Sequence, residues 1–334
     1  MKRLLLLFLA LALVLYLVNA SWFASPLPDG ELKLISHRGV HQTYDRTDLD
    51  RDACTATRIY PPKHAFLENT IPSMAAAFSA GADIVELDVH PTTDGKFAVF
   101  HDWTLDCRTN ESGVTRNHSL KDLKALDIGY GYTADGGKSY PFRGTASSRI
   151  PSLKEVLAAF PHGQFLINFK SKDVREAEQL EELLLAHPDW RPRIWGVYGG
   201  DEPTRQMGEL VPGIRNFTKS DTKSCLMEYL ALGWSGYVPE PCRGRQILVP
   251  SNYAPWLWGW PNRFLKRMND HDTEVLLAGS PNGSGGIDSL EQLHSVPDDF
   301  SGYVWTNKIE IIGPMLGGRP NKKGEVINPA SHEN

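Results

Sequence analysis

The chain has 334 residues, a formal net charge of −5 at pH 7, 41% hydrophobic residues and 22% charged residues. This composition is that of an ordinary globular protein, and the length suffices for one large domain of barrel size or two smaller ones. The negative net charge argues against a nucleic-acid-binding protein, which neutralises phosphates with lysine and arginine. It also argues against a protein held at a membrane surface by electrostatics.

The N-terminus departs from this average composition. Two basic residues, Lys2 and Arg3, precede the apolar run Leu4–Val18. A basic start followed by an apolar run and a small residue is typical of a secretory signal peptide. Continued through Ala24, the run is also long enough to span a bilayer, which takes about 20 residues. Residues 1–24 are therefore expected to be a signal peptide or a transmembrane anchor. Both alternatives place the rest of the chain beyond the cytoplasmic membrane, anchored to it or released into the periplasm or medium.

Four cysteines fit an exported protein, because disulfides persist outside the cytoplasm. None has the CxxC spacing of a zinc site. We expect Cys225 to pair with Cys242 in a short local loop. We also expect Cys54 to pair with Cys107, which would tie two long loops together near His101. The alternative is four free, partly buried thiols.

Strand-like and helix-like segments alternate along the rest of the chain. Strands are predicted at Leu32–His37, Ile84–Val89, Phe97–His101, Phe165–Phe169, Ile194–Val197, Ile214–Phe217, Ile247–Val249, Glu274–Leu277 and Tyr303–Thr306. Helices are predicted at Ile71–Ala80, Leu153–Phe160, Val174–Ala186, Thr204–Leu210, Thr222–Leu232, Phe264–Asn269 and Leu290–His294, with Ser152 and Asp221 as N-caps.

This alternation predicts a parallel sheet, and its length favours a closed α/β barrel, the (β/α)8 TIM barrel, over residues 30–315. Nine strands is one too many for such a barrel. The strands that meet at the Thr-Thr-Asp-Gly turn after Val89 are expected to form a partial hairpin, or else one late segment is a loop. Residues 316–334 are expected to be a polar, disordered tail.

Two long segments interrupt the alternation, residues 40–67 after the first strand and residues 103–149 after the third. Long loops in compact domains are usually lids or binding loops. The second contains a glycine-rich stretch, but Tyr132 stands where a phosphate-binding loop needs glycine. The stretch Ala254–Pro261 carries three tryptophans at alternating positions, which predicts either an exposed rim or packing between barrel and helix.

Polar residues gather at one expected edge of the barrel. Glu86 and Asp88 lie two residues apart on a buried strand, so their side chains point to the same face. Two buried acids side by side call for a positive partner, and a hard divalent cation is the usual one. At or near the ends of the first four strands, where barrel enzymes keep their chemistry, lie further polar residues: His37, Glu68, His101, Asn168 and Lys170.

Five short motifs carry a specific resemblance: His37-Arg38-Gly39, Glu68-Asn69-Thr70, Val85-Glu86-Leu87-Asp88-Val89, Thr93-Asp94-Gly95 and His101-Asp102. In order and approximate spacing they resemble the glycerophosphodiester phosphodiesterase family, strongly over residues 34–108 and weakly as far as Pro314. The resemblance implies a metal-dependent (β/α)8 barrel that hydrolyses glycerophosphodiesters, or lysophospholipids, to an alcohol and glycerol phosphate.

The same resemblance implies roles for individual residues. His37 and His101 are the expected catalytic acid and base, without a decision as to which is which. Glu86 and Asp88 are the expected ligands of Mg²⁺ or Ca²⁺, and Arg38 and Lys170 the expected phosphate contacts.

Two departures qualify this expectation. Asn168 stands where the family has a third metal-binding glutamate, so the site loses a charge, and Glu68 is expected to ligate or orient nearby. Trp305-Thr306-Asn307 resembles a substrate-binding signature, but its place before Ile309–Pro314 is that of the closing strand, and this contact is not carried over. The alternative function is a phospholipid- or phosphodiester-binding barrel with weak or no catalysis.

Overall fold

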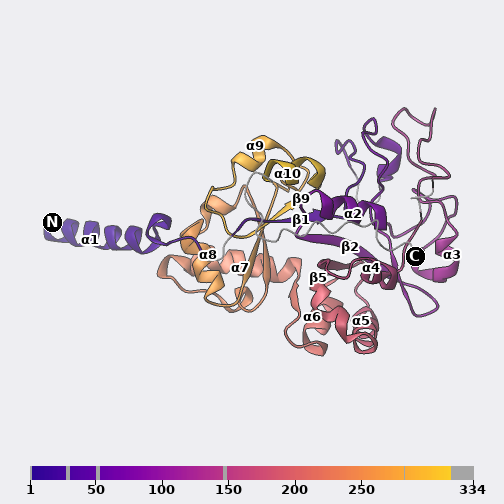
Figure 1. Cartoon of the computed structure of the whole chain (residues 1–334). Coiled ribbons are helices and arrows are strands. Elements are labelled where there is room, and N and C mark those ends of the chain that lie inside the picture. The colour runs from indigo at the N-terminus through magenta and orange to yellow at the C-terminus, as the bar shows by residue number, and fades with distance from the viewer. Residues whose placement is uncertain (1, 28–30, 50–52, 146–148, 282, 317–334) are drawn as a thin grey trace. The chain divides into compact units, whose positions relative to one another are not determined.

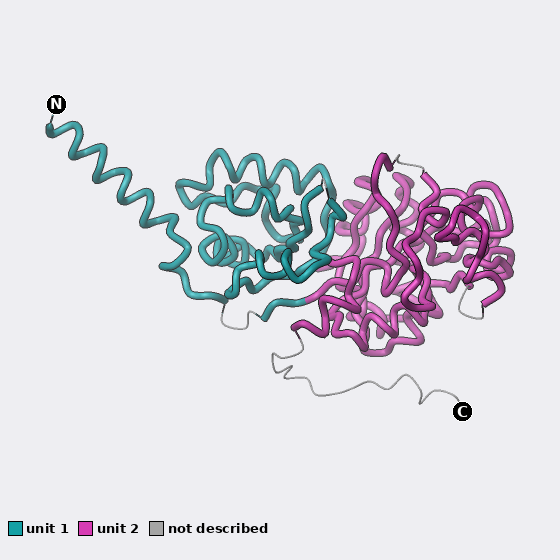
Figure 2. Tube along the Cα trace, turned by 90° about the horizontal axis from the view of Figure 1, so that it is seen from above, with its two compact units in different colours: residues 1–33, 215–305 teal, residues 34–214, 306–334 magenta. Residues whose placement is uncertain are grey.

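The computed structural model describes residues 2–27, 31–49, 53–145, 149–281 and 283–316 (Figure 1). Figure 2 colours its two compact units. Unit 1 comprises residues 1–33 and 215–305, and unit 2 comprises residues 34–214 and 306–334. The tail expected at residues 316–334 lies, beyond Leu316, outside the described residues.

Eight parallel strands make up a nearly closed barrel, so the predicted (β/α)8 TIM barrel is confirmed. The strands follow one another in the order β6-β5-β4-β2-β1-β9-β8-β7. Their bounds are β1 (Lys33–His37), β2 (Ile84–Pro91), β4 (Phe165–Phe169), β5 (Ile194–Gly199), β6 (Arg215–Phe217), β7 (Gln246–Pro250), β8 (Glu274–Ala278) and β9 (Tyr303–Thr306). The register sets His37 opposite Glu86, and Asp88 opposite Asn168.

The ninth strand, β3 (Phe97–Val99), pairs antiparallel with β2 and is not a barrel strand. The expected partial hairpin is therefore confirmed, and the placement of Phe97–His101 as the third barrel strand is wrong. The reason is the turn at Thr92–Lys96, where the backbone NH of Thr92 donates to the carbonyl of Lys96. This turn folds the chain back along β2, so that the NH of Phe100 donates to the carbonyl of Asp88.

Unit 2 holds strands that are buried on both faces, as parallel strands in barrels are. Every residue of β2 except Pro91 is buried. Its helices are α2 (Ile71–Ser79), α3 (Leu120–Lys124), α4 (Leu153–Ala159), α5 (Arg175–Ala186), α6 (Asp201–Leu210) and α10 (Ile309–Leu316). Capping boxes start α2 at Thr70 and α4 at Ser152, which confirms the predicted cap at Ser152.

The two long loops of unit 2 pack on each other around a second hydrophobic core. Its buried members come from both loops and from their neighbours: Ala56, Ile59, Leu67, Ala98, Phe100, Leu105, Leu120, Leu123, Leu126, Ile128, Tyr132, Phe142 and Ile150. The glycine-rich stretch serves this packing, because a Cβ on Gly131 would lie 1.9 Å from the carbonyl oxygen of Cys107. The loops are thus a packed layer beside the barrel rather than open lids.

Unit 1 contains β6 to β8, most of β9, and the helices α1 (Lys2–Asn19), α7 (Lys219–Leu232), α8 (Asn262–Asn269) and α9 (Leu290–His294). Thr218 caps α7 by accepting from the NH of Asp221, so the predicted cap at Asp221 is wrong. The helix begins earlier than its apolar periodicity suggested, because its first turn is polar. Of the three tryptophans, Trp258 and Trp260 are half-buried, while Trp256 is 74% exposed.

Both predicted disulfides are present, and the alternative of four free thiols is wrong. Cys225 on α7 joins Cys242, and Cys54 joins Cys107, with Cα–Cα distances of 4.7 Å and 5.2 Å. The first bond lies in unit 1. The second links the long loop after β1 to the long loop after β3, as expected.

The N-terminal helix α1 is long and apolar enough to cross a membrane, and none of its residues is buried. Its last residue contacts the rest of unit 1. The Asn19 side chain donates to the carbonyl of Trp234 (2.8 Å) and accepts from the Arg267 guanidinium (3.0 Å). Directly afterwards, Ser21 accepts from the backbone NH of Asn262 (2.8 Å).

Candidate functional site

The predicted site residues come together in unit 2 around Asp88, which lies on β2 with its side chain fully buried. Its two carboxylate oxygens receive donors from three elements. Oδ1 accepts from the Asn168 amide (2.8 Å) and lies 3.3 Å from Nζ of Lys170. Oδ2 accepts from the Asn69 amide (2.9 Å) and lies 3.2 Å from Nε of Arg38. Burial opposes ionisation of Asp88, but Lys170 and Arg38 outweigh it and hold the pKa well below its usual value.

Two residues of this cluster have an unusual backbone conformation. Arg38 and Asn69 have φ values of 60° and 59°, a left-handed conformation that is uncommon outside glycine. Hydrogen bonds enforce it: the NH of Arg38 donates to the carbonyl of Glu86, and the NH of Asn69 donates to the carbonyl of Arg38. Strained backbone of this kind is found where function demands a particular side-chain direction.

Glu86 lies two residues before Asp88 on the same strand and is also fully buried. Its Oε1 accepts from the Tyr198 hydroxyl at 2.6 Å, and its Oε2 accepts from the NH of Arg38 at 3.1 Å. Burial, and then the neighbouring charge of Asp88, raise the pKa of Glu86 to about 8. Glu86 is therefore the acid of this cluster whose charge is least compensated.

Glu68 holds two arginines, one with each oxygen. Oε1 lies 3.0 Å from Nη1 of Arg38, and Oε2 lies 3.2 Å from Nη1 of Arg108. Burial opposes ionisation, but Arg108 and Arg38 together lower the pKa of Glu68 below its usual value. With both oxygens ion-paired, Glu68 is placed to orient the arginines.

His37 ends β1 and contacts both its strand neighbour and the end of the barrel. Its Nδ1 lies 2.7 Å from Oδ1 of Asn307, and its Nε2 lies 3.7 Å from Oε2 of Glu86. Because an amide oxygen can only accept, Nδ1 carries the proton of the neutral ring. Burial, and then the charge of Arg38, hold the pKa of His37 well below its usual value.

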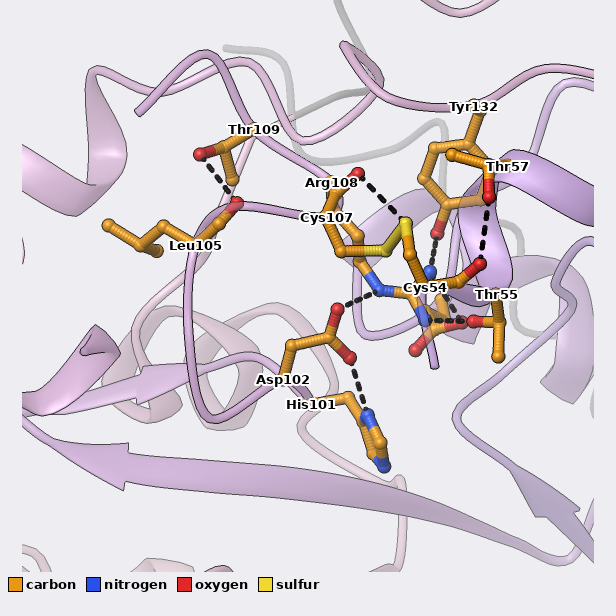
Figure 3. Close-up of a disulfide and its surroundings, with 11 residues drawn as sticks. Cys54, Thr55, Thr57, His101, Asp102, Leu105, Cys107, Arg108, Thr109 and Tyr132 are labelled. Carbon is orange, nitrogen blue, oxygen red and sulfur yellow. Dashed lines mark hydrogen bonds and ion pairs between the residues drawn. A yellow bond between two sulfur atoms is a disulfide. The ribbon is translucent and has the colours of Figure 1, made fainter. Parts of the chain in front are cut away.

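His101 is held by a second set of partners, shown in Figure 3. Its Nδ1 lies 2.7 Å from Oδ1 of Asp102, whose Oδ2 accepts from Nε of Arg108 at 2.8 Å. Burial and Arg38 lower the pKa of His101, and the hydrogen bond to Asp102 offsets part of that shift. Both histidines are therefore neutral near pH 7, each with its Nδ1 engaged.

Five contributors to this cluster were not singled out from the sequence: Asn69, Asp102, Arg108, Tyr198 and Asn307. Asn69 and Asp102 belong to quoted motifs, and Tyr198 directly follows a predicted strand, so these three carried a local signal. Asn307 meets His37 across 270 positions of sequence. The sequence signature that contains Asn307 was set aside because of its position on the closing strand. Arg108 carried no signal beyond its neighbour Cys107.

The arrangement concentrates buried groups of both charges in one place. Four carboxylates, Glu68, Glu86, Asp88 and Asp102, face three basic side chains, Arg38, Arg108 and Lys170. Within the residues that the structure describes, no three His, Cys, Asp or Glu side chains are grouped as a metal site. Asn168 presents its amide nitrogen to Asp88.

Comparison with known sequences identifies relatives of this region. Residues 37–194 match the model of the Glycerophosphoryl diester phosphodiesterase family. The glycerophosphodiester phosphodiesterase of Bacillus subtilis is 37% identical over 123 residues, which cover 36% of this chain and 40% of that protein. A lysophospholipase D of Rattus norvegicus is 32% identical over 136 residues, which cover 39% of this chain and 40% of that protein. The chain thus spans about two fifths of the length of the curated relatives it matches.

Comparison with solved structures extends the likeness of fold to most of the chain. A glycerophosphoryl diester phosphodiesterase domain from Mycobacterium tuberculosis has a TM-score of 0.59 at 15% identity, and the match covers 85% of this chain and 99% of that one. A phosphodiesterase from Oleispira antarctica, solved with the product sn-glycerol-3-phosphate, has a TM-score of 0.51 at 18% identity and coverages of 83% and 94%.

Proposed function

Since the resemblance to the glycerophosphodiester phosphodiesterase family is confirmed over residues 37–194, we propose that this protein is a phosphoric diester hydrolase. It cleaves glycerophosphodiesters, or lysophospholipids, to an alcohol and glycerol phosphate. The relative named as a lysophospholipase D and the product bound to the Oleispira antarctica phosphodiesterase both support this choice of substrates. The observation that carries the proposal is the pair of histidines, each oriented through Nδ1, beside the buried acids of β2.

The two histidines act as acid and base. In each neutral ring Nδ1 carries the proton, so Nε2 has the lone pair that can take a proton from the nucleophilic hydroxyl. The other histidine must be protonated so that it can donate a proton to the oxygen of the leaving alcohol. Binding of a negatively charged phosphodiester favours that protonation, because it offsets the effect of Arg38, which lowers the pKa of both rings.

Arg38 and Lys170 bind the phosphate. Both cations lie against the same carboxylate, Asp88, at 3.2 Å and 3.3 Å, and so they converge on one place. Arginine offers a planar, bidentate contact and lysine a compact charge, which suit two different phosphoryl oxygens. Glu68 keeps the guanidinium of Arg38 in position through its own ion pair.

A divalent cation fits the acids of β2. Burial, and then the charge of Asp88, raise the pKa of Glu86 more than Arg38 and Lys170 lower it, and a hard cation would supply further positive charge. Glu86 and Asp88 would hold the ion, with the side-chain oxygen of Asn168 as a neutral third donor. When bound, Mg²⁺ or Ca²⁺ would polarise a phosphoryl oxygen. Mg²⁺ suits this set of donors better, because it retains several waters whereas Ca²⁺ takes six to eight oxygens.

The helix α1 remains on the protein as a membrane anchor, with Lys2 and Arg3 on the cytoplasmic side and the barrel beyond the membrane. Support comes from the contacts of Asn19 with Trp234 and Arg267, which a cleaved signal peptide has no need of. Trp22 and Phe23, 66% and 54% exposed, follow the helix where aromatic residues favour the membrane interface. This location suits an enzyme of lipid-derived substrates.

Turnover by the purified full-length chain tests the function. The substrates are glycerophosphodiesters with choline, ethanolamine or glycerol head groups and the matching lysophospholipids, each with Mg²⁺, Ca²⁺ or a chelator. Released alcohol and glycerol phosphate are measured. We expect turnover of at least one diester with metal and its loss with chelator. Binding of these compounds without turnover would instead support the alternative of a phosphodiester-binding barrel.

A further inference from the structure

We infer that the Cys54–Cys107 disulfide is a positioning element for His101 that acts through Arg108. This inference rests on the proposed catalytic role of His101 and adds a function for a bond that lies outside the cluster of acids and histidines. Figure 3 shows the path from the two sulfurs to the imidazole.

The first step is a double connection between the two long loops. Cys54 and Cys107 form the disulfide, and their sequence neighbours Thr55 and Arg108 form a hydrogen bond, with Nη2 of Arg108 donating to the Thr55 hydroxyl at 2.8 Å. The covalent bond therefore fixes the backbone on both sides of this hydrogen bond. The NH of Gly131 donates to the carbonyl of Arg108, and its missing side chain allows the close approach to Cys107.

The second step runs from Arg108 to the imidazole. The guanidinium is buried, with only 4% of the side chain exposed, and Nε donates to Asp102 at 2.8 Å. The other oxygen of Asp102 holds Nδ1 of His101 at 2.7 Å. A carboxylate can orient a histidine only if it is itself held, and Arg108 is the cation that holds Asp102. Arg108 also donates to the Tyr132 hydroxyl, which fixes the guanidinium from a further side.

The third step connects the same arginine to the phosphate-binding side of the cluster. Nη1 of Arg108 lies 3.2 Å from Glu68, whose other oxygen holds Arg38. A shift of Arg108 would therefore be felt at His101 through Asp102 and at Arg38 through Glu68. Because Arg38 is additionally held by Asp88, the effect should fall mainly on His101.

The second hydrophobic core explains why the disulfide is needed for position rather than for folding. That core already keeps the two loops together, so a chain without the Cys54–Cys107 bond should fold. Apolar contacts are non-directional and tolerate small displacements, whereas the hydrogen bonds of Arg108 do not. Misplacement of a catalytic group by about 1 Å is enough to reduce turnover by about 100-fold.

The other disulfide provides a matched control. Cys225 and Cys242 lie in unit 1, whereas every residue of the candidate site lies in unit 2. Replacing Cys225 and Cys242 by serine removes one crosslink, as replacing Cys54 and Cys107 does. Only the replacement of Cys54 and Cys107 should affect the imidazole of His101.

The experiment compares the full-length chain, Cys54→Ser with Cys107→Ser, and Cys225→Ser with Cys242→Ser, each with and without His101→Ala. All are assayed below the unfolding temperature of the least stable variant, determined by circular dichroism. We expect the Cys54/Cys107 variant to lose roughly 10–100-fold in kcat with KM changed far less, and the Cys225/Cys242 variant to keep its kcat. With His101→Ala present, loss of Cys54 and Cys107 should lower kcat far less, because the disulfide acts mainly through the group already removed. An equal loss of kcat in both backgrounds would overturn the inference.

A second readout does not depend on turnover. In protein labelled with ¹⁵N-histidine, the ring resonances of His101, assigned by their absence in His101→Ala, report whether Nδ1 keeps its proton against Asp102. We expect them to change in the Cys54/Cys107 variant and to be preserved in the Cys225/Cys242 variant. Unchanged resonances in both would contradict the inference. A chain that shows this change but hydrolyses no diester would refute the proposed function and leave the positioning role standing.

Discussion

Tyr198 donates a 2.6 Å hydrogen bond to Oε1 of Glu86 and so joins the end of β5 to a fully buried carboxylate on β2. This bond favours the ionised carboxylate, yet burial and the charge of Asp88 outweigh it and leave the pKa of Glu86 raised to about 8. A buried acid with such a pKa makes both stability and metal binding depend on pH.

Without metal, the stability of the fold should decrease as the pH rises, because of Glu86. The folded state keeps the proton up to a pKa of about 8, whereas the unfolded chain releases it near the ordinary value of 4.5. The contribution is fully present below the lower value and is lost as the pH rises through the higher one. In chelator, the free energy of unfolding in urea should therefore fall relative to Glu86→Gln, by at most about 1.4 kcal/mol per pH unit. Tyr198→Phe should move the loss to higher pH. Parallel curves for wild type and Glu86→Gln would contradict this.

Asp88→Ala should abolish metal-dependent turnover. Asp88 is the carboxylate on which Arg38, Lys170, Asn69 and Asn168 converge, so its removal takes away a proposed ligand and the group that positions both phosphate-binding cations. Binding of Mg²⁺, measured by calorimetry, and turnover should be lost together. If Asp88→Ala remains active and chelation has no effect on the wild type, the acids of β2 are structural and no ion takes part.

Asn168→Glu should tighten binding of the divalent cation. The substitution adds a carboxylate beside Asp88, where Asn168 now donates its amide at 2.8 Å. Three carboxylates bind a hard cation better than two carboxylates and an amide. Calorimetry should show a lower dissociation constant for Mg²⁺ than in the wild type, while Asn168→Gln, which keeps the amide, should not. Weaker binding in Asn168→Glu would show that the third donor is not at this position.

His37→Ala and His101→Ala should each lower kcat by roughly 10²–10⁴-fold, the usual contribution of a general acid or base, while Mg²⁺ binding is retained. Each ring is neutral and oriented through Nδ1, so each removal deletes one proton-transfer group. His162→Ala is the control, because His162 is exposed and lies outside the cluster. Full activity of either catalytic variant would refute the two-histidine mechanism.

Export of the barrel can be tested in bacteria. Alkaline phosphatase fused after Asn334 is active only beyond the cytoplasmic membrane, and we expect an active fusion. Because Asn19 holds α1 to unit 1, the chain recovered from membranes should retain its N-terminus, as mass spectrometry would show. A stable but inactive fusion would refute export, and a chain that begins after Ala20 would refute the anchor.

The sequence predicted most of the barrel because its elements depend on local patterns. β4 and β9 have the predicted bounds, and the capping box at Ser152 is a feature of four consecutive residues. The errors occurred where tertiary structure decides. Phe97–His101 has the composition of a barrel strand, but the turn before it sends it back along β2. Asp221 resembles a cap, yet the helix extends one turn further to Thr218.

The sequence indicated most of the residues of the candidate site but not the hydrogen bonds that connect them. The motifs located both histidines and the acids of β2, because strand ends in a barrel meet at one edge. They did not locate the groups that orient them. Asn307 and Arg108 are identified only by the distances at which they hold His37 and Asp102. The register of β1, β2 and β4 explains the rest, since it places Glu86 beside His37 and Asn168 beside Asp88.

The contact between His37 and Asn307 gives the site an order of assembly. His37 lies on the first barrel strand and Asn307 directly follows the last, so the pair forms only after the intervening chain has been made and folded. In a protein that is threaded across a membrane from its N-terminus, His37 emerges long before Asn307. The disulfide beside Arg108 likewise awaits an oxidising compartment. Under the proposed export and activity, a nascent chain still on the cytoplasmic side would therefore lack a complete set of oriented histidines and would not cleave the cell's own phosphodiesters.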